Sequence, residues 1–115
     1  MNFLDRYELV PCFDQITYVK TNKTNKTNQI LADYLTTWND SEHIKEEILA
    51  DLEQIEAGEL KESEIGADVA GLAYIRPHKT TIMGSNFGYP NLDLPTEDFK
   101  GVVLEWVAFL EANGY

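Results

Sequence analysis

The sequence predicts an α+β fold, in which an antiparallel sheet packs against about three amphipathic helices in a single pair of layers. Apolar residues recur at spacings of three and four in some segments and of two in others, which are the periods of helices and strands. The expected order is strand, strand, helix, helix, strand, strand, helix, and this favours an antiparallel sheet over βαβ units. With 115 residues, we expect one domain, residues 1–115.

The first twenty residues are expected to form two strands. Apolar residues stand two apart within residues 7–9 and again within 16–18, as one face of a half-buried strand requires. Pro11 is expected to separate the two runs. The polar repeat at residues 21–28 is rich in residues that favour loops, so we expect a solvated loop that ends in a helix cap.

Two amphipathic helices are predicted between residues 29 and 58. The first begins at Gln29, and its apolar residues share one face of the helix, which we call its stripe: Ile30, Leu31, Tyr34, Leu35 and Trp38. The second is expected to begin with Asn39 or Ser41 as N-cap, with acids in its first turn, where the helix dipole favours negative charge. Gly58 is expected to end it. Its stripe is Ile44, Ile48, Leu49, Leu52 and Ile55.

A β-hairpin is predicted in the second half of the chain. Residues 59–64 read as a polar, acidic link, and residues 69–75 have the composition of a strand. Residues 76–79 are expected to form a turn, because a proline at its second position presets the backbone angle. Residues 80–83 then return as the antiparallel partner.

A loop and a long helix are predicted at the end of the chain. Residues 84–95 contain two glycines and two prolines, and a loop of this length is often functional or mobile. The helix is expected to run from Thr96, as N-cap, to Gly114. Its stripe is Phe99, Val102, Val103, Trp106, Val107 and Leu110. Trp38 and Trp106 both occupy stripe positions, and we expect both in the core.

Negative charge is concentrated in one part of the chain. The formal net charge is −11, and residues 40–68 hold eleven Asp or Glu against two Lys. Helical geometry is expected to turn these acids away from the core, with Glu46 and Glu53 opposite the stripe, Glu47 and Asp51 on one flank, and Glu42 and Glu56 on the other. Such a surface repels nucleic acid and attracts basic proteins, so the charge indicates a protein-binding module.

The sequence does not contain the residue patterns of common catalytic, metal or cofactor sites. His43 and His78 have no second His or Cys at metal-ligand spacing, and no Gly-rich phosphate loop, nucleophile elbow or EF-hand loop is present. Carboxylate pairs occur, but twenty acids in 115 residues produce pairs by chance. We therefore expect no enzyme, no cofactor and no metal, and a small enzyme that uses a carboxylate pair within residues 84–95 is the alternative. Cys12, the only cysteine, is expected to be partly buried.

The N-terminus has no basic start followed by an apolar run, and no apolar stretch approaches the roughly 20 residues of a membrane span. A cytoplasmic protein is therefore expected.

Three segments carry a resemblance to a known family. They are a helix that ends in Ile-x-x-Gly at residues 48–59, a strand opening at 64–69, and a Pro-Thr-x-x-Phe helix with a later Glu-Trp, at 94–99 and 105–110. Together they resemble small immunity proteins of bacterial contact-dependent growth inhibition and related polymorphic toxin systems, over roughly residues 30–111.

The resemblance implies a cytosolic inhibitor that binds, one to one, the toxic C-terminal domain of a secreted effector, commonly a nuclease, with an RNase favoured. A nuclease keeps a basic cleft for phosphates, which a folded acidic surface can occupy as a phosphate mimic. No direct contact with nucleic acid or membrane is expected. The alternative is an acidic adaptor or regulatory module that binds a different basic protein.

The expected toxin contacts are Glu46, Glu47, Asp51, Glu53 and Glu56 on the acidic helix, and Phe87, Tyr89 and Asp93 in the loop. Aromatic anchors are expected to supply most of the affinity, and the acids orientation and speed of association. Burial of Phe87 and Tyr89 beneath the loop is the other interpretation of these two residues.

Overall fold

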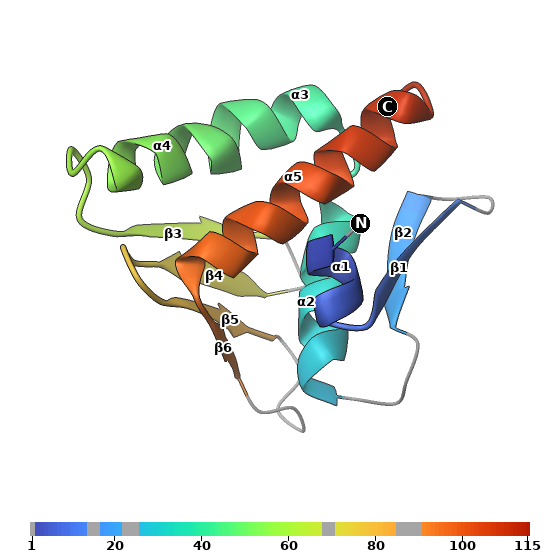
Figure 1. Ribbon diagram of the computed structural model, residues 1–115, viewed down its shortest axis with the longest axis horizontal. Helices are drawn as coiled ribbons and strands as arrows, with labels where there is room; N and C mark the ends of the chain where they lie inside the picture. Colours follow the sequence, from blue (N-terminus) through green and yellow to red (C-terminus); the bar gives the residue numbers. More distant parts are fainter. Residues whose placement is uncertain (1, 14–16, 22–25, 68–70, 85–90) are drawn as a thin grey trace.

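The protein has an α+β fold with a four-stranded antiparallel sheet, as the sequence predicts (Figure 1). The computed structural model describes residues 2–13, 17–21, 26–67, 71–84 and 91–115. The sheet has the order β3-β4-β5-β6, and its strands are β3 (Ser63–Gly66), β4 (Leu72–Ile75), β5 (Thr80–Met83) and β6 (Leu92–Leu94). A separate two-stranded sheet consists of β1 (Leu9–Phe13) and β2 (Thr17–Thr21).

The N-terminal region contains one helix that the sequence did not predict, α1 (Asn2–Arg6). A strand pair is present, but β1 begins only at Leu9, with Tyr7 in the turn before it, and Ile16 of the second expected run lies outside the described residues. Pro11 does not separate the two strands; it lies inside β1, opposite Val19. A proline is tolerated there because both strands of a two-stranded sheet are edge strands, where a missing N–H need not break the ladder.

Helix α2 (Lys26–Thr37) begins earlier than expected, so the end of the polar repeat is helical instead of a loop. A tertiary contact explains this difference, because the Asn28 side-chain amide donates to the Tyr7 carbonyl at 2.7 Å. The inward face of α2 is the predicted stripe, with Leu31, Tyr34 and Leu35 almost fully buried.

The acidic helix consists of three consecutive segments: α3 (Ser41–Ile44), the π-helical turn η1 (Lys45–Leu49) and α4 (Ala50–Glu56). The N–H of Ala50 donates to the carbonyl of Lys45, five residues earlier, which is the π-helical bond. Ile44, Ile48 and Leu52 are all buried at intervals of four residues. This wider turn keeps them on one face, where a regular α-helix would rotate them gradually out of the core.

The caps of this helix differ in part from the prediction. The N-cap is Asp40, whose carboxylate accepts from the backbone N–H of His43 at 3.2 Å, so neither Asn39 nor Ser41 is the cap. Ser41 is buried, and its hydroxyl donates to the Tyr115 carbonyl at 2.7 Å instead. Gly58 ends the helix as predicted, with a φ of 77° that glycine adopts without strain.

The hairpin of β4 and β5 is confirmed, with Ile75 opposite Thr80 and the Arg76 N–H donating to the Lys79 carbonyl at 3.0 Å. Two further strands flank the hairpin, β3 where a strand was expected to open at residues 64–69 and β6 where a loop was expected. The acidic link ends in β3, and the expected loop at 84–95 contains β6. Strand β6 has only three residues, too few for a two-residue period to stand out.

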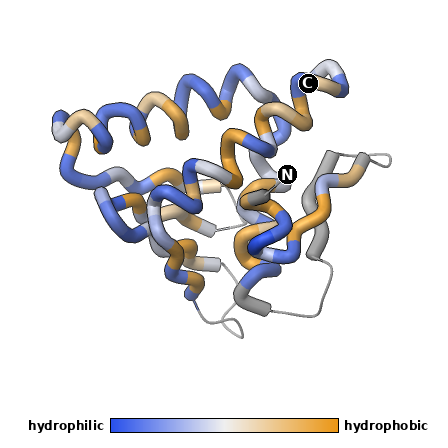
Figure 2. Tube along the Cα trace, in the orientation of Figure 1, coloured by the Kyte–Doolittle hydropathy of each residue, from blue (hydrophilic) through white to orange (hydrophobic). Residues whose placement is uncertain are grey.

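The last helix, α5 (Thr96–Ala112), begins and ends close to the predicted positions. Its N-cap is Pro95 and not Thr96, whose hydroxyl is directed away from the helix and donates to the Arg76 carbonyl. Trp38 and Trp106 are both buried, as expected, and the Trp106 indole donates to the Trp38 carbonyl at 2.7 Å. Figure 2 shows hydrophilic and hydrophobic residues alternating along α3 to α5, as helices with one buried face require.

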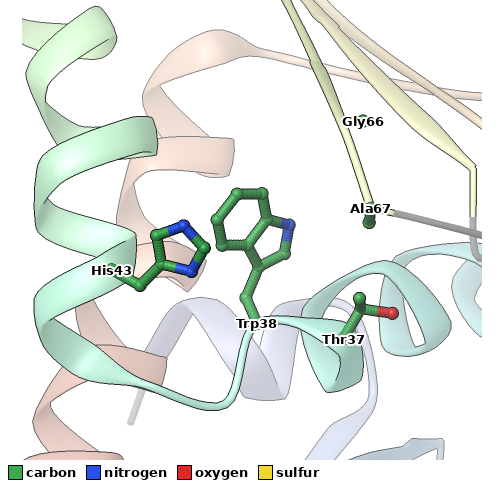
Figure 3. A pocket seen from close by; sticks show the side chains of 5 residues that line it. All are labelled: Thr37, Trp38, His43, Gly66 and Ala67. Atoms are coloured by element: carbon green, nitrogen blue, oxygen red, sulfur yellow. The ribbon is translucent and has the colours of Figure 1, made fainter.

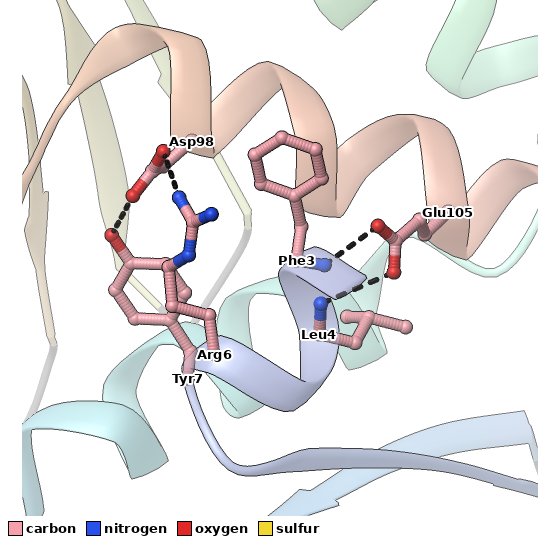
Figure 4. Close-up of polar contacts among 6 residues, drawn as sticks. All are labelled: Phe3, Leu4, Arg6, Tyr7, Asp98 and Glu105. Carbon is pink, nitrogen blue, oxygen red and sulfur yellow. Dashed lines mark hydrogen bonds and ion pairs between the residues drawn. The ribbon is translucent and has the colours of Figure 1, made fainter. Parts of the chain in front are cut away.

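Helix α1 lies against α5 and is held there by two carboxylates (Figure 4). The hydrogen bonds are from the backbone N–H groups of Phe3 (2.7 Å) and Leu4 (3.2 Å) to Glu105, and from Arg6 (2.7 Å) and the Tyr7 hydroxyl (2.7 Å) to Asp98. Burial, followed by the bond to Asp98, raises the pKa of the Tyr7 phenol. None of the described helices combines the length and apolar character needed to cross a membrane.

Candidate functional site

The acidic helix presents carboxylates on the side away from the core. We define the acidic face as Glu46, Glu47, Asp51, Glu53 and Glu56, the five helix residues expected to contact a partner. Four of them are exposed, and Asp51 is half-buried. Their common origin on one continuous helix explains why the sequence alone could place them together.

Three of these carboxylates are available to a partner. Glu46, Glu47 and Glu53 are exposed, and none of their carboxylates has a hydrogen bond or ion pair in the part of the chain that the structure describes. The nearest cation in the sequence, Lys45, is engaged elsewhere, with Glu111 at 2.9 Å and Glu42 at 3.6 Å. The hydrogen bond to Glu111 raises the pKa of the Lys45 ammonium, so this side chain stays charged and paired at neutral pH.

The other two residues of the acidic face already make internal contacts. Asp51 accepts a hydrogen bond from the Ser63 hydroxyl at 2.5 Å and so connects α4 to β3. Glu56 pairs with Lys100 at 2.7 Å and connects α4 to α5. Both carboxylates therefore have a structural role in addition to any contact with a partner.

Of the three loop residues expected to extend the site, the structure describes only Asp93, and it does not lie at the acidic face. Phe87 and Tyr89 lie outside the described residues. Asp93 lies in β6, at the opposite edge of the sheet from β3, which is the strand bonded to α4. It accepts from the Thr81 hydroxyl at 2.6 Å and pairs with Lys79 at 3.4 Å, and chiefly the Thr81 bond lowers the pKa of its carboxyl.

Asp93 belongs instead to a polar row across the sheet face opposite the core. The strand register places Glu64, Tyr74, Thr81 and Asp93 side by side from β3 to β6. Arg76 lies 4.8 Å from the centre of the Tyr74 ring and donates to Thr81 at 2.7 Å. This row could not be predicted from the sequence, because it requires the register of all four strands, including β6, which was not expected.

A small pocket lies where the end of α2, the start of α3 and the end of β3 meet (Figure 3). It has a volume of about 120 Å³ and is lined by Thr37, Trp38, His43, Gly66 and Ala67. The rings of Trp38 and His43 are 5.0 Å apart, and the Trp38 indole nitrogen has no hydrogen-bond partner among the described residues. A wider and more open hollow of about 360 Å³ lies beside Lys79 and Asp93.

The described residues contain no group of three or more His, Cys, Asp or Glu side chains arranged to hold a metal ion. Comparison of the chain with protein-family models, with curated proteins and with solved structures finds no match.

Proposed function

We propose that this protein is an immunity protein, which binds the basic C-terminal toxin domain of a contact-dependent inhibition effector and neutralises it in the cytoplasm. The toxin is a nuclease, with an RNase favoured, and the complex is one to one. The single observation that carries the proposal is the acidic face, on which Glu46, Glu47 and Glu53 are exposed and unpaired on one continuous helix.

This arrangement suits an inhibitor of a phosphate-cleaving enzyme. A nuclease cleft uses Lys and Arg to hold phosphates, and carboxylates fixed on a helix offer it negative charges at set positions. Like charges at neighbouring helix positions cost a few tenths of a kcal/mol each, so the helix retains them at the expense of stability. Opposite charge on the partner relieves that repulsion and accelerates association, by roughly 10 to 10³-fold at low salt.

Growth rescue tests the proposal directly. The toxin domain encoded immediately upstream is expressed with and without this protein, and growth is expected only with it. An acidic adaptor is the alternative, and it is supported if rescue fails while the protein still binds another basic protein. Turnover of a metabolite by the purified protein, abolished by one substitution, would refute both.

The contribution of the acidic face is tested by charge reversal. Glu46→Lys/Glu53→Lys is expected to slow association with the toxin domain at least several-fold at low salt, with little effect in about 1 M salt, where screening acts over about 3 Å. The matched control is Asp5→Lys/Glu97→Lys, which makes the same change in net charge at exposed positions outside the acidic face. Equal rates for both double variants would show that the acidic face is only a solvated surface.

A further inference from the structure

We propose that Asn113 is a modification site: its side-chain amide is converted to a carboxylate by the adjacent backbone, without an enzyme, and the conversion loosens α3 from the end of α5. The proposal does not depend on the function proposed above. Asn113 is the only asparagine in the sequence that is followed by glycine. Asparagine is among the thermally labile residues, and glycine has no Cβ to shield the peptide nitrogen that follows Asn113.

The reaction takes place between neighbouring groups of the chain and consumes only water. The backbone nitrogen of Gly114 attacks the side-chain carbonyl carbon, Cγ, of Asn113, and a cyclic imide forms. The side-chain nitrogen leaves as ammonia and takes with it the proton that the Gly114 nitrogen loses. Water then opens the ring. Addition at Cγ restores the original main chain and leaves an aspartate, whereas addition at the main-chain carbonyl carbon leaves an isoaspartate, in which the chain runs through Cγ.

The structure holds this pair of residues at the exposed end of α5 (Figure 1). Gly114 has a φ of 83°, the left-handed conformation in which glycine commonly ends a helix. A Cβ atom at Gly114 would meet nothing within 4 Å among the described residues, so water reaches the site freely. The glycine is explained by the end of the helix, and the reactive pair is a chemical consequence of that helix end.

Two hydrogen bonds occupy the reacting groups while the helix end is closed. The Gly114 N–H donates to the Glu111 carbonyl at 3.2 Å, and the Asn113 side-chain amide donates to the Phe109 carbonyl at 2.8 Å. Helix ends fray, and exposed terminal hydrogen bonds open at a small cost in free energy. The reaction is therefore expected to proceed in the folded protein, but more slowly than in the unfolded chain.

The next residue, Tyr115, joins the end of α5 to the start of α3. Its N–H donates to the Leu110 carbonyl at 2.8 Å, and its carbonyl accepts from the N–H (3.3 Å) and the hydroxyl (2.7 Å) of Ser41. Ser41 is only 5% exposed, so loss of this acceptor leaves buried donors unsatisfied. An isoaspartate lengthens the main chain before Gly114 and displaces Tyr115. An aspartate places a negative charge at the negative end of the helix dipole, close in the sequence to Glu111.

Mass spectrometry of the aged, whole protein tests the site. Trypsin releases residues 101–115 as one peptide, because no Lys or Arg follows Lys100. After incubation at mildly alkaline pH, the mass gain of an amide-to-acid conversion is expected in this peptide at least several-fold faster than in the peptides that carry Asn39 and Asn91. Gly114→Ala shields the attacking nitrogen and is expected to slow the gain at least several-fold. No gain in residues 101–115, or equal gains in all three peptides, would overturn the proposal.

The effect on α3 is tested with the variant Asn113→Asp, which carries one of the two products. Its Ser41 amide is expected to exchange with solvent at least threefold faster than in the unmodified protein, as measured by ¹H–¹⁵N NMR. The matched control is Asn91→Asp, which adds the same charge at an exposed position just before β6 and is expected to leave Ser41 unchanged. If Asn113→Asp does not fold, aged protein separated by anion exchange replaces it. Equal exchange at Ser41 in the modified and control proteins would refute the link to α3.

Discussion

Replacing Gly101 with alanine tests how α1 is held on α5. The structure predicts that this substitution lowers the free energy of unfolding, although alanine usually stabilises a helix relative to glycine. Gly101 lies in the interior of α5, and a Cβ atom there would stand 2.3 Å from Cγ of the Phe3 ring. Alanine is favoured over glycine in a helix by about 1 kcal/mol. A clash with a packed side chain costs about 1–3 kcal/mol. We therefore expect Gly101→Ala to destabilise the protein, by about 1 kcal/mol at the middle of these ranges.

The assay is a double-mutant cycle measured by urea unfolding. In the Phe3→Ala background the new methyl group has space, so Gly101→Ala is expected to stabilise by about 1 kcal/mol. The change of sign corresponds to a coupling free energy of about 2 kcal/mol between the two positions, within the range found for residues in contact. If Gly101→Ala stabilises the protein equally in both backgrounds, then Phe3 does not pack on Gly101 and the placement of α1 is wrong.

Three further predictions concern the carboxylates and phenols of the fold. Glu105→Gln keeps the shape of the side chain but removes the charge that accepts two backbone N–H groups of α1, and it is expected to cost about 1 kcal/mol in urea unfolding. The pKa of Asp93 is lowered on folding, so its contribution to stability is present above its unfolded pKa, near 3.8, and is lost as the pH falls through its folded value. Asp93→Asn is therefore expected to make the acid dependence of unfolding less steep below about pH 4, and an unchanged slope would contradict this. The pKa of Tyr7 is raised on folding, so stability is expected to decline as the pH rises above about 10, and less so in Tyr7→Phe, as followed by circular dichroism.

The sequence predicted the elements that carry their own periodic signal. The buried stripes of α2, α4 and α5 follow helical spacing, and the proline turn between β4 and β5 indicates the hairpin. Helix α1 could not be predicted in this way. Its five residues are too few for a stable isolated helix, and it is held by Asp98 and Glu105, which lie about ninety to one hundred residues away in the chain.

Only the part of the candidate site whose residues lie close together in the sequence could be predicted. The acidic face lies on one helix, so composition and helical geometry were sufficient to place it. The pairing of Glu56 with Lys100 depends on tertiary structure, and so does the bond between Asp51 and Ser63. The pocket was missed for the same reason, and because Trp38 fits a core position equally well by its spacing.

The attachment of α1 has a consequence for synthesis on the ribosome. The bond from Phe3 to Glu105 joins positions 102 residues apart, so α5 must be synthesised before α1 has this surface to bind. Closing so long a loop is entropically costly, and contacts of this kind form late in folding. Until α5 has emerged from the ribosome, α1 therefore remains without its binding surface and accessible to chaperones and proteases.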